Sequence, residues 1–309
     1  MQRTTRDSSI FSRRGFFAGA AAACTGVLLA PGTQFAAAEV PHDVPPEDYR
    51  MQRGRVKLSV YHWCFAPMPA EQLIRACHRL GVSAMDVGQD QYPLLRELGM
   101  QVAMVGSHGF ARGPFSKTNH DFCLEKLRAA IDLAVRWGCS KVITFTGMRE
   151  PGVTDEQGAR SCVDCWKQVI GYAEKKGITL CLELLNTRDD SHPMKGHPGY
   201  FGDDFQRCID LIQRVDSPRM KLLFDVYHVQ IMNGDVIRRI RQFKDTIGHY
   251  HVAGVPGRGE LDDTQEVNYP AVLRAILDTG YTGLVSLEFI PTWPDKLAAL
   301  RHAVRVCDV

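Results

Sequence analysis

Glycine-rich phosphate-binding turns are missing from the sequence. The first run expected to form a strand, Lys57 to Trp63, is followed by the segment 64–69, which holds no glycine. Nucleotide-binding sheets of the doubly wound type usually carry such a turn directly after the first strand, and a P-loop is also missing. We therefore expect no nicotinamide or nucleotide cofactor.

A large excess of charge is also missing. The 309 residues carry 37 basic and 35 acidic side chains. Residues 1–38 hold four arginines and one aspartate, so the remainder carries 33 basic and 34 acidic side chains, a net charge of −1. A chain this balanced has no general attraction for nucleic acid or for anionic membranes. We expect neither as a partner.

The number and spacing of the ten cysteines do not indicate a disulfide framework. Cys24 lies in the N-terminal segment, which leaves an odd number, nine, in a chain long enough to fold without disulfides. Cys162 and Cys165 form a C-x-x-C pair, but no second pair completes a zinc site. We predict no disulfide framework and expect this pair to lie in a helix, on its core side and its surface.

Residues 1–38 have the layout of an export signal. Arg13 and Arg14 precede an apolar segment at 18–30, and three alanines at 36–38 offer a cleavage site. The apolar segment is too short to span a bilayer, which argues against a membrane anchor. Because the paired arginines resemble twin-arginine signals, we predict export to the periplasm and no membrane attachment after cleavage.

Beyond this segment, short apolar runs alternate with amphipathic stretches. Residues 39–54 contain three prolines and are expected to form a linker. From 55 to 309 we expect one catalytic domain with eight strands. The expected strands are Lys57–Trp63, Val82–Val87, Gln101–Gly106, Lys141–Thr146, Ile178–Leu184, Lys221–Asp225, Ile247–Ala253 and Leu284–Phe289.

Helical patterns separate these strands. They include Glu71–Leu80, Asn119–Trp137, Glu156–Lys176, Phe205–Val215, Val236–Phe243 and Tyr269–Leu277, and several end at a glycine. Apolar strands separated by helices indicate a parallel sheet covered by helices. Eight such units in about 250 residues match a (β/α)₈ TIM barrel, an α/β fold.

Four polar residues interrupt the last four apolar strands near their carboxyl ends. They are Glu183, Asp225, His251 and Glu288. In this fold the chemistry gathers at the carboxyl ends of the strands, and three carboxylates placed together there would repel one another without a cation. Oxygen and imidazole ligands without sulfur suit one divalent ion, with Mn²⁺, Mg²⁺ or Co²⁺ favoured over Zn²⁺. The alternative is that each acid is paired separately with an arginine or a hydroxyl.

Several motifs carry a family resemblance along residues 57–300. The segments 182–189, 198–201, 224–230, 251–258, 266–269 and 287–289 are similar in order and content to the hydroxypyruvate isomerase branch of the xylose isomerase-like TIM barrels. The resemblance implies a divalent metal on the four residues above, and homodimers or homotetramers. It also implies substrate contacts near His228 and Arg258. His251 stands where hydroxypyruvate isomerases tend to carry glutamine and ketose 3-epimerases carry histidine.

The expected chemistry is a proton transfer next to a carbonyl group. An α-hydroxy carbonyl compound or sugar that chelates a metal through two oxygens loses a proton to give an enediolate. We predict that Glu183 and Glu288 move the proton and that Asp225 and His251 hold the metal. Returning the proton to the adjacent carbon gives isomerisation, and returning it to the same carbon from the opposite face gives epimerisation.

Other polar residues follow the strands and are candidates to line the pocket. Those after the later strands are Asn186, Arg188, Asp189 and Gln230, and those near the ends of the first three are His62, Trp63, Asp86 and His108. Packing of the barrel mouth is the alternative for the second group.

Three other functions share parts of this pattern. A ketose 3-epimerase or a polyol dehydratase would use the same ligands, and an exported barrel that only binds sugar or metal would not catalyse proton exchange. A zinc endonuclease would need more histidines and a basic groove, and the balanced charge argues against it.

Overall fold

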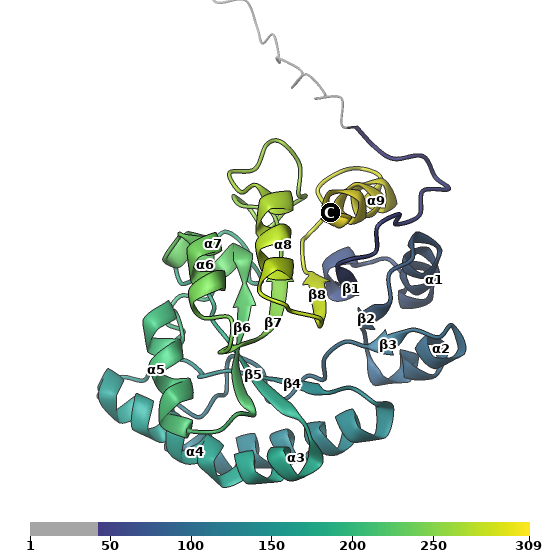
Figure 1. The fold of residues 1–309 in the computed structure, drawn as a ribbon. Helices are drawn as coiled ribbons and strands as arrows, with labels where there is room; N and C mark the ends of the chain where they lie inside the picture. Colours follow the sequence, from purple (N-terminus) through teal and green to yellow (C-terminus); the bar gives the residue numbers. More distant parts are fainter. Residues whose placement is uncertain (1–42) are drawn as a thin grey trace, which may run out of the picture. The chain divides into compact units, whose positions relative to one another are not determined.

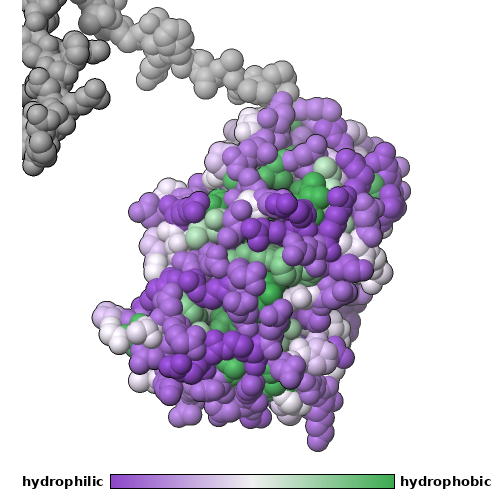
Figure 2. All heavy atoms as spheres, turned by 60° about the vertical axis from the view of Figure 1, so that its left-hand side comes forward, coloured by the Kyte–Doolittle hydropathy of each residue, from purple (hydrophilic) through white to green (hydrophobic). Residues whose placement is uncertain are grey.

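The computed structural model describes residues 43–309. The predicted export signal and the start of the predicted linker lie outside the described residues. Within the described part, no helix is long and apolar enough to cross a membrane. Val44 and Val135 are the large hydrophobic side chains exposed there, and Figure 2 shows a mostly hydrophilic face with small, separate hydrophobic areas.

Eight parallel strands form one curled sheet, as the sequence predicts (Figure 1). In chain order they are β1 (Lys57–Tyr61), β2 (Ala84–Asp86), β3 (Gln101–Val102), β4 (Lys141–Thr144), β5 (Thr179–Glu183), β6 (Met220–Asp225), β7 (Ile247–Val252) and β8 (Leu284–Leu287). The strand order is β3-β2-β1-β8-β7-β6-β5-β4. Its two edges meet through a parallel bridge between Val105 and Val142, which closes the barrel.

Helices surround the sheet (Figure 1). They are α1 (Ala70–Leu80), α2 (Tyr92–Glu97), α3 (His120–Trp137), α4 (Asp155–Lys176), α5 (Phe205–Val215), α6 (Val226–Met232), α7 (Val236–Gln242), α8 (Tyr269–Asp278) and α9 (Lys296–Cys307). Gly81, Gly138 and Gly177 end three of them in the left-handed conformation, where a side chain would be strained. The apolar faces of these helices pack on the strands to form the core.

Seven of the eight expected strands are shorter than predicted, and the sixth begins one residue earlier, at Met220. The first and the third illustrate the reason. The first ends at Tyr61 because the following residues turn into a short 3-10 helix, Trp63–Phe65, in which Phe65 N–H donates to His62 O. The third ends at Val102, although Val105 returns to the sheet. His62 and Trp63 therefore lie at the start of the 3-10 helix and Met104 and Gly106 lie outside β3, and these four residues line the cavity described below.

The described part of the linker contains no helix or strand, but it is attached to the barrel. The backbone N–H groups of Gln52, Arg53 and Gly54 donate to the carboxylate of Asp308, at the end of α9. The nine cysteines of the described residues are free and buried, and Cys162 and Cys165 both pack inside on α4.

A candidate metal centre at the barrel mouth

Glu183, Asp225, His251 and Glu288 converge at the carboxyl ends of neighbouring strands. One ligand atom from each lies within 4.8 Å of the others. His251 Nδ1 lies 2.8 Å from Glu288 Oε2 and 3.2 Å from Glu183 Oε1. The sequence prediction that these four side chains share one site therefore agrees with the geometry.

Strand register explains why they meet. Glu183 and Asp225 are the last residues of β5 and β6, and Asp225 pairs in register with His251 on β7. Glu288 follows β8, and its N–H donates to Val252 O. Asp225 also begins α6, where its carboxylate accepts from the backbone N–H of Tyr227.

Burial and the neighbouring charges strongly shift the pKa values of the ionisable groups in this cluster. Burial raises the pKa of Glu183 to about 7 and also raises the pKa of Asp225. Burial would raise the pKa of Glu288 as well, but the charges of Arg258 and His251 outweigh it and lower the pKa to about 2. Burial alone would lower the pKa of His251, yet the neighbouring carboxylates raise it well above its usual value. Each group depends on the others for its charge.

The residues fit a divalent metal ion. Among the described residues, Glu183 Oε1 and His251 Nε2 are buried polar atoms without a well-formed hydrogen bond. Three carboxylates lie together, and within residues 43–309 the positive charges that offset them at short range are those of His251 and Arg258. Buried carboxylates in this state are costly, and oxygen and imidazole donors are the ligands of Mn²⁺, Mg²⁺, Co²⁺ and Zn²⁺.

Arg258 is the nearest cation to the cluster. Its Nη2 lies 2.6 Å from Glu288 Oε2 and 3.4 Å from Asp225 Oδ2, and the residue is 2% exposed. The guanidinium lies over the rings of Trp63 and Tyr227. Its backbone φ is 56°, a conformation that few residues other than glycine adopt.

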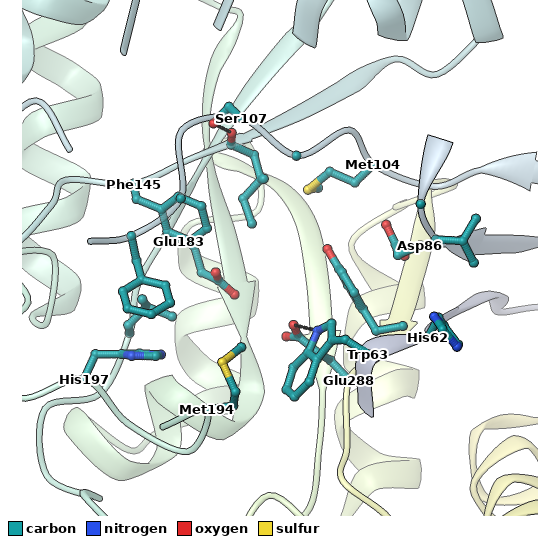
Figure 3. Close-up of a pocket in the computed structure, with 18 of the residues that line it drawn as sticks. His62, Trp63, Asp86, Met104, Ser107, Phe145, Glu183, Met194, His197 and Glu288 are labelled. Carbon is teal, nitrogen blue, oxygen red and sulfur yellow. Dashed lines mark hydrogen bonds between the residues drawn. The ribbon is translucent and has the colours of Figure 1, made fainter. Parts of the chain in front are cut away.

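A cavity of about 400 Å³ opens directly beside the cluster (Figure 3). Glu183, Glu288 and Arg258 line it, whereas Asp225 and His251 lie beneath with no exposed surface. The remaining walls are mostly apolar or aromatic. They include Tyr61, Trp63, Met104, Phe110, Ile143, Phe145, Leu185 and Met194. The volume lies within the range of small-molecule sites.

Of the ten residues that the sequence suggests for substrate contacts or for lining the pocket, four line the cavity: Arg258, His62, Trp63 and Asp86. Asn186 and His228 lie behind the cluster, where Asn186 N–H donates to His228 Nδ1. His228 Nε2 faces Asp225 Oδ2 at 3.6 Å. These two support the ligands rather than face the cavity.

The other four candidates point elsewhere. Arg188 is exposed and donates to Ile231 O, and Gln230 donates to Glu266. Asp189 accepts from Tyr227. His108 is buried next to the cavity and bonds Gly109 O and Thr144 Oγ1.

Other cavity residues carry no sequence signal of their own. Phe110 and His197 stack with ring centroids 4.0 Å apart, and they come from the loops after β3 and β5. His197 lies fourteen residues after Glu183, the last residue of β5. Its distance from the strand end therefore gives no reason to place it in the cavity. The nearest sequence signal is the motif at 198–201, which begins at the residue directly after His197.

Comparison with known proteins agrees with the fold. Residues 92–307 match the family described as xylose isomerase-like TIM barrel. A putative hydroxypyruvate isomerase of Drosophila melanogaster is 33% identical over 232 residues, which cover 71% of this chain and 84% of that protein. The putative hydroxypyruvate isomerase of Homo sapiens is 31% identical over 172 residues, which cover 54% of this chain and only 60% of that protein.

The solved structures give the same fold. The structure of L-ribulose 3-epimerase matches with a TM-score of 0.67 and 18% identity, over 80% of this chain and 92% of that one. This likeness concerns the fold alone. The barrel, the four converging ligands and the match over residues 92–307 show that the chain belongs to the xylose isomerase-like TIM barrel family.

Proposed function

We propose that this protein is a metal-dependent isomerase of small hydroxy-carbonyl compounds, most like hydroxypyruvate isomerase. The observation that carries the proposal is the division of the four ligands. Glu183 and Glu288 line the cavity, whereas Asp225 and His251 are fully buried beneath it. A proton-transfer centre of this kind needs two carboxylates that face the substrate and can move the proton. It also needs ligands that hold the metal without facing the substrate.

Each residue then has a defined task. Asp225 and His251 would hold the ion, and a bound divalent ion would act as a Lewis acid on the carbonyl and neighbouring hydroxyl oxygens of the substrate. Glu183 removes a proton from the carbon next to the carbonyl group, which gives an enediolate. Glu288 returns a proton to the former carbonyl carbon, and the proton of the substrate hydroxyl group passes to the former carbonyl oxygen, so that the neighbouring carbon becomes the new carbonyl group. Trp63, whose Nε1 donates to Glu288 Oε1 at 3.2 Å, keeps this carboxylate in place.

The cavity walls favour a small keto acid or sugar. The aromatic and apolar side chains exclude water from the reacting carbon, and Arg258 supplies a positive charge beside Glu288 that can meet a substrate carboxylate. The similarity to putative hydroxypyruvate isomerases supports the same substrate class.

The test follows the proton directly. Protein loaded with Mn²⁺, Mg²⁺ or Co²⁺ is incubated with hydroxypyruvate and a panel of ketoses in D₂O, and deuterium incorporation is followed by NMR. Deuterium at the carbon next to the carbonyl group, together with the isomerised product, supports the proposal. No incorporation with any compound and any of the three metals contradicts it.

Epimerisation at a ketose carbon is the second candidate. Its support is His251, the ligand that ketose 3-epimerases carry at this position, and the presence of two carboxylates at the cavity. In the same experiment, an epimer labelled at the exchanged carbon with no aldose–ketose interconversion would assign this reaction instead.

We also propose export through the twin-arginine route and assembly into homodimers or homotetramers. Export is supported by Arg13 and Arg14 before the apolar segment 18–30, and assembly by the family resemblance. Fractionation of cells that express the full chain or its Arg13→Lys/Arg14→Lys variant tests the first proposal, because loss of the paired arginines should leave the protein in the cytoplasm. Light scattering of the purified protein tests the second.

A further inference from the structure

Asp86, at the end of β2, is a buried carboxylate that the metal centre does not use. It is 6% exposed and lines the same cavity as Glu183 and Glu288. Its Oδ2 accepts hydrogen bonds from Ser59 and Ser286, at 3.3 and 3.5 Å. Its Oδ1 is buried and has no hydrogen-bond partner among the described residues.

The polar side chains behind Asp86 fix its orientation. Ser59 and Ser286 are partners in the register of β1 and β8, and their hydroxyl groups lie 2.5 Å apart. Ser286 is also bonded to His249 Nε2 at 2.8 Å. This network engages Oδ2 and leaves Oδ1 as the unpartnered oxygen of a residue that lines the cavity.

Asp86 and Glu183 lie on different sides of the cavity. They belong to β2 and β5, which in the closed barrel are separated by β3 and β4 on one side and by β1, β8, β7 and β6 on the other. In Figure 3 the two carboxylates lie on opposite sides of the view, with Glu288 and Trp63 between them. A substrate that reaches both therefore extends across the cavity.

Positive charge is concentrated away from Asp86. Arg258 is the only arginine or lysine among the cavity-lining residues of the described chain, and it is bonded to Glu288 and Asp225. His62, next to Asp86 in Figure 3, has its Nε2 engaged with Met68 O. Tyr61, the register partner of Asp86, also lines this end of the cavity. A second carboxylate on the substrate would thus meet a like charge and no cation here.

A buried carboxylate oxygen without a donor is unfavourable, so the site gains most from a ligand that supplies one. Burial also raises the pKa of Asp86 to about 7, and it carries a charge above that pH. An uncharged hydroxyl group satisfies the free oxygen without adding charge.

We propose that Asp86 is a specificity-determining residue that accepts a hydrogen bond from a hydroxyl group at the end of the substrate remote from Glu183. This inference rests on the proposed function and narrows its substrate class. The preferred substrate is a hydroxyl-terminated keto acid or ketose with more than three carbons, because a three-carbon compound would fill only a small part of about 400 Å³.

The experiment measures binding rather than turnover. Metal-loaded protein, freed of excess metal, is titrated at a pH above 7 with threonate, an unreactive four-carbon sugar acid, and with its 4-deoxy analogue. Dissociation constants come from calorimetry and from the intrinsic fluorescence of the four tryptophans, of which Trp63 lines the cavity. The same pair is measured with Asp86→Ala and with Asp86→Asn, which keeps the size of the side chain. Asp90→Asn, an exposed acid four residues further along, is the matched control.

The wild type and the Asp90→Asn control should bind threonate at least about tenfold more tightly than the deoxy analogue, since a hydrogen bond to a charged group is lost with the hydroxyl. Asp86→Ala should reduce this ratio to about one, and Asp86→Asn should give an intermediate ratio. Tartrate, which carries a second carboxylate at the same end, should bind the wild type more weakly than threonate and should gain affinity in Asp86→Ala.

An equal affinity of the wild type for both compounds, or an unchanged ratio in both Asp86 variants, overturns the inference. Either result leaves the proposed function intact if deuterium exchange is observed. Conversely, a clear preference in the wild type that is lost in Asp86→Ala, without exchange on any compound, would support this specificity and reject the isomerase.

Discussion

The Arg258 guanidinium lies 2.6 Å from a Glu288 carboxylate oxygen, and both side chains are buried at the barrel mouth. A buried pair of this kind is stable only while both members are present. Arg258 also reaches Asp225 at 3.4 Å, so one cation offsets two carboxylates. The arginine therefore stands next to the ligands that a divalent ion would share.

Arg258→Met should destabilise the metal-free protein by about 3–5 kcal/mol, because it leaves buried carboxylates without their cation. Added Mn²⁺ should raise the melting temperature more in the variant than in the wild type, since the ion replaces part of the lost charge. Thermal unfolding with EDTA and with Mn²⁺ checks both effects. Arg188→Met removes an exposed arginine and should change neither the stability of the metal-free protein nor the rise in melting temperature with Mn²⁺. A variant as stable as the wild type in EDTA would contradict the role given to Arg258.

Glu183→Gln and Glu288→Gln should each lower turnover by about 10²–10⁴-fold, the usual contribution of a positioned proton-transfer group. Glutamine has nearly the same shape as glutamate, so both proteins should fold, but Glu288→Gln should be the less stable of the two because Arg258 keeps only Asp225 as a carboxylate partner. Initial rates on the substrate found by deuterium exchange, with circular dichroism as the folding check, test this. Glu266→Gln, an exposed glutamate bonded to Gln230, is the control. Near-normal turnover in either buried variant would reject the two-carboxylate mechanism.

The four ligands could be predicted because each interrupts an apolar strand near its end. In a parallel barrel all such ends lie on one face, so Glu183, Asp225, His251 and Glu288 had to be near one another once eight strands were recognised. Strand position fixes where a side chain starts and, through alternation, which way it points. For this reason the sequence alone predicts that these four side chains share one site.

The loop residues could not be placed in the same way. Asn186 and His228 follow strand ends, but their side chains bond each other behind the cluster instead of facing the cavity. Phe110 and His197 enter the cavity from loops that have no periodicity. The contacts of the linker with Asp308 join residues more than 250 positions apart, and no local pattern announces them. Loop direction depends on tertiary packing, which the sequence pattern does not contain.

Asp308→Ala should detach the linker from the barrel and lower the free energy of unfolding by about 1–3 kcal/mol. The carboxylate accepts from the N–H groups of Gln52, Arg53 and Gly54, and the substitution leaves them without that acceptor. Urea unfolding measures the loss, and hydrogen exchange should become faster at 52–54. Asp278→Ala, whose side chain is largely exposed, is the control. Slow exchange at 52–54 in the variant would show that Asp308 does not hold the linker.

Burial holds His108 in its neutral form, and its hydrogen bonds fit one neutral tautomer. Gly109 O can only accept, so Nδ1 carries the proton, and Nε2 is left to accept from Thr144 Oγ1 at 3.0 Å. Thr144 is in turn the acceptor for Trp166 Nε1. Burial lowers the pKa of His108 to about 4, from an ordinary value of 6.5.

A lowered pKa in the folded state makes His108 a source of acid sensitivity. Above pH 6.5 the residue is neutral in both states and its contribution is fully present, whereas between pH 6.5 and about 4 the unfolded chain binds the proton first. The free energy of unfolding should therefore fall across this window, by up to about 3 kcal/mol from this residue.

His108→Gln should be less stable than the wild type at neutral pH, but its free energy of unfolding should fall less on acidification. Urea unfolding at a series of pH values measures both slopes, and the exposed His78→Gln should follow the wild type. Parallel slopes for His108→Gln and the wild type would show that this histidine is not buried in its neutral form.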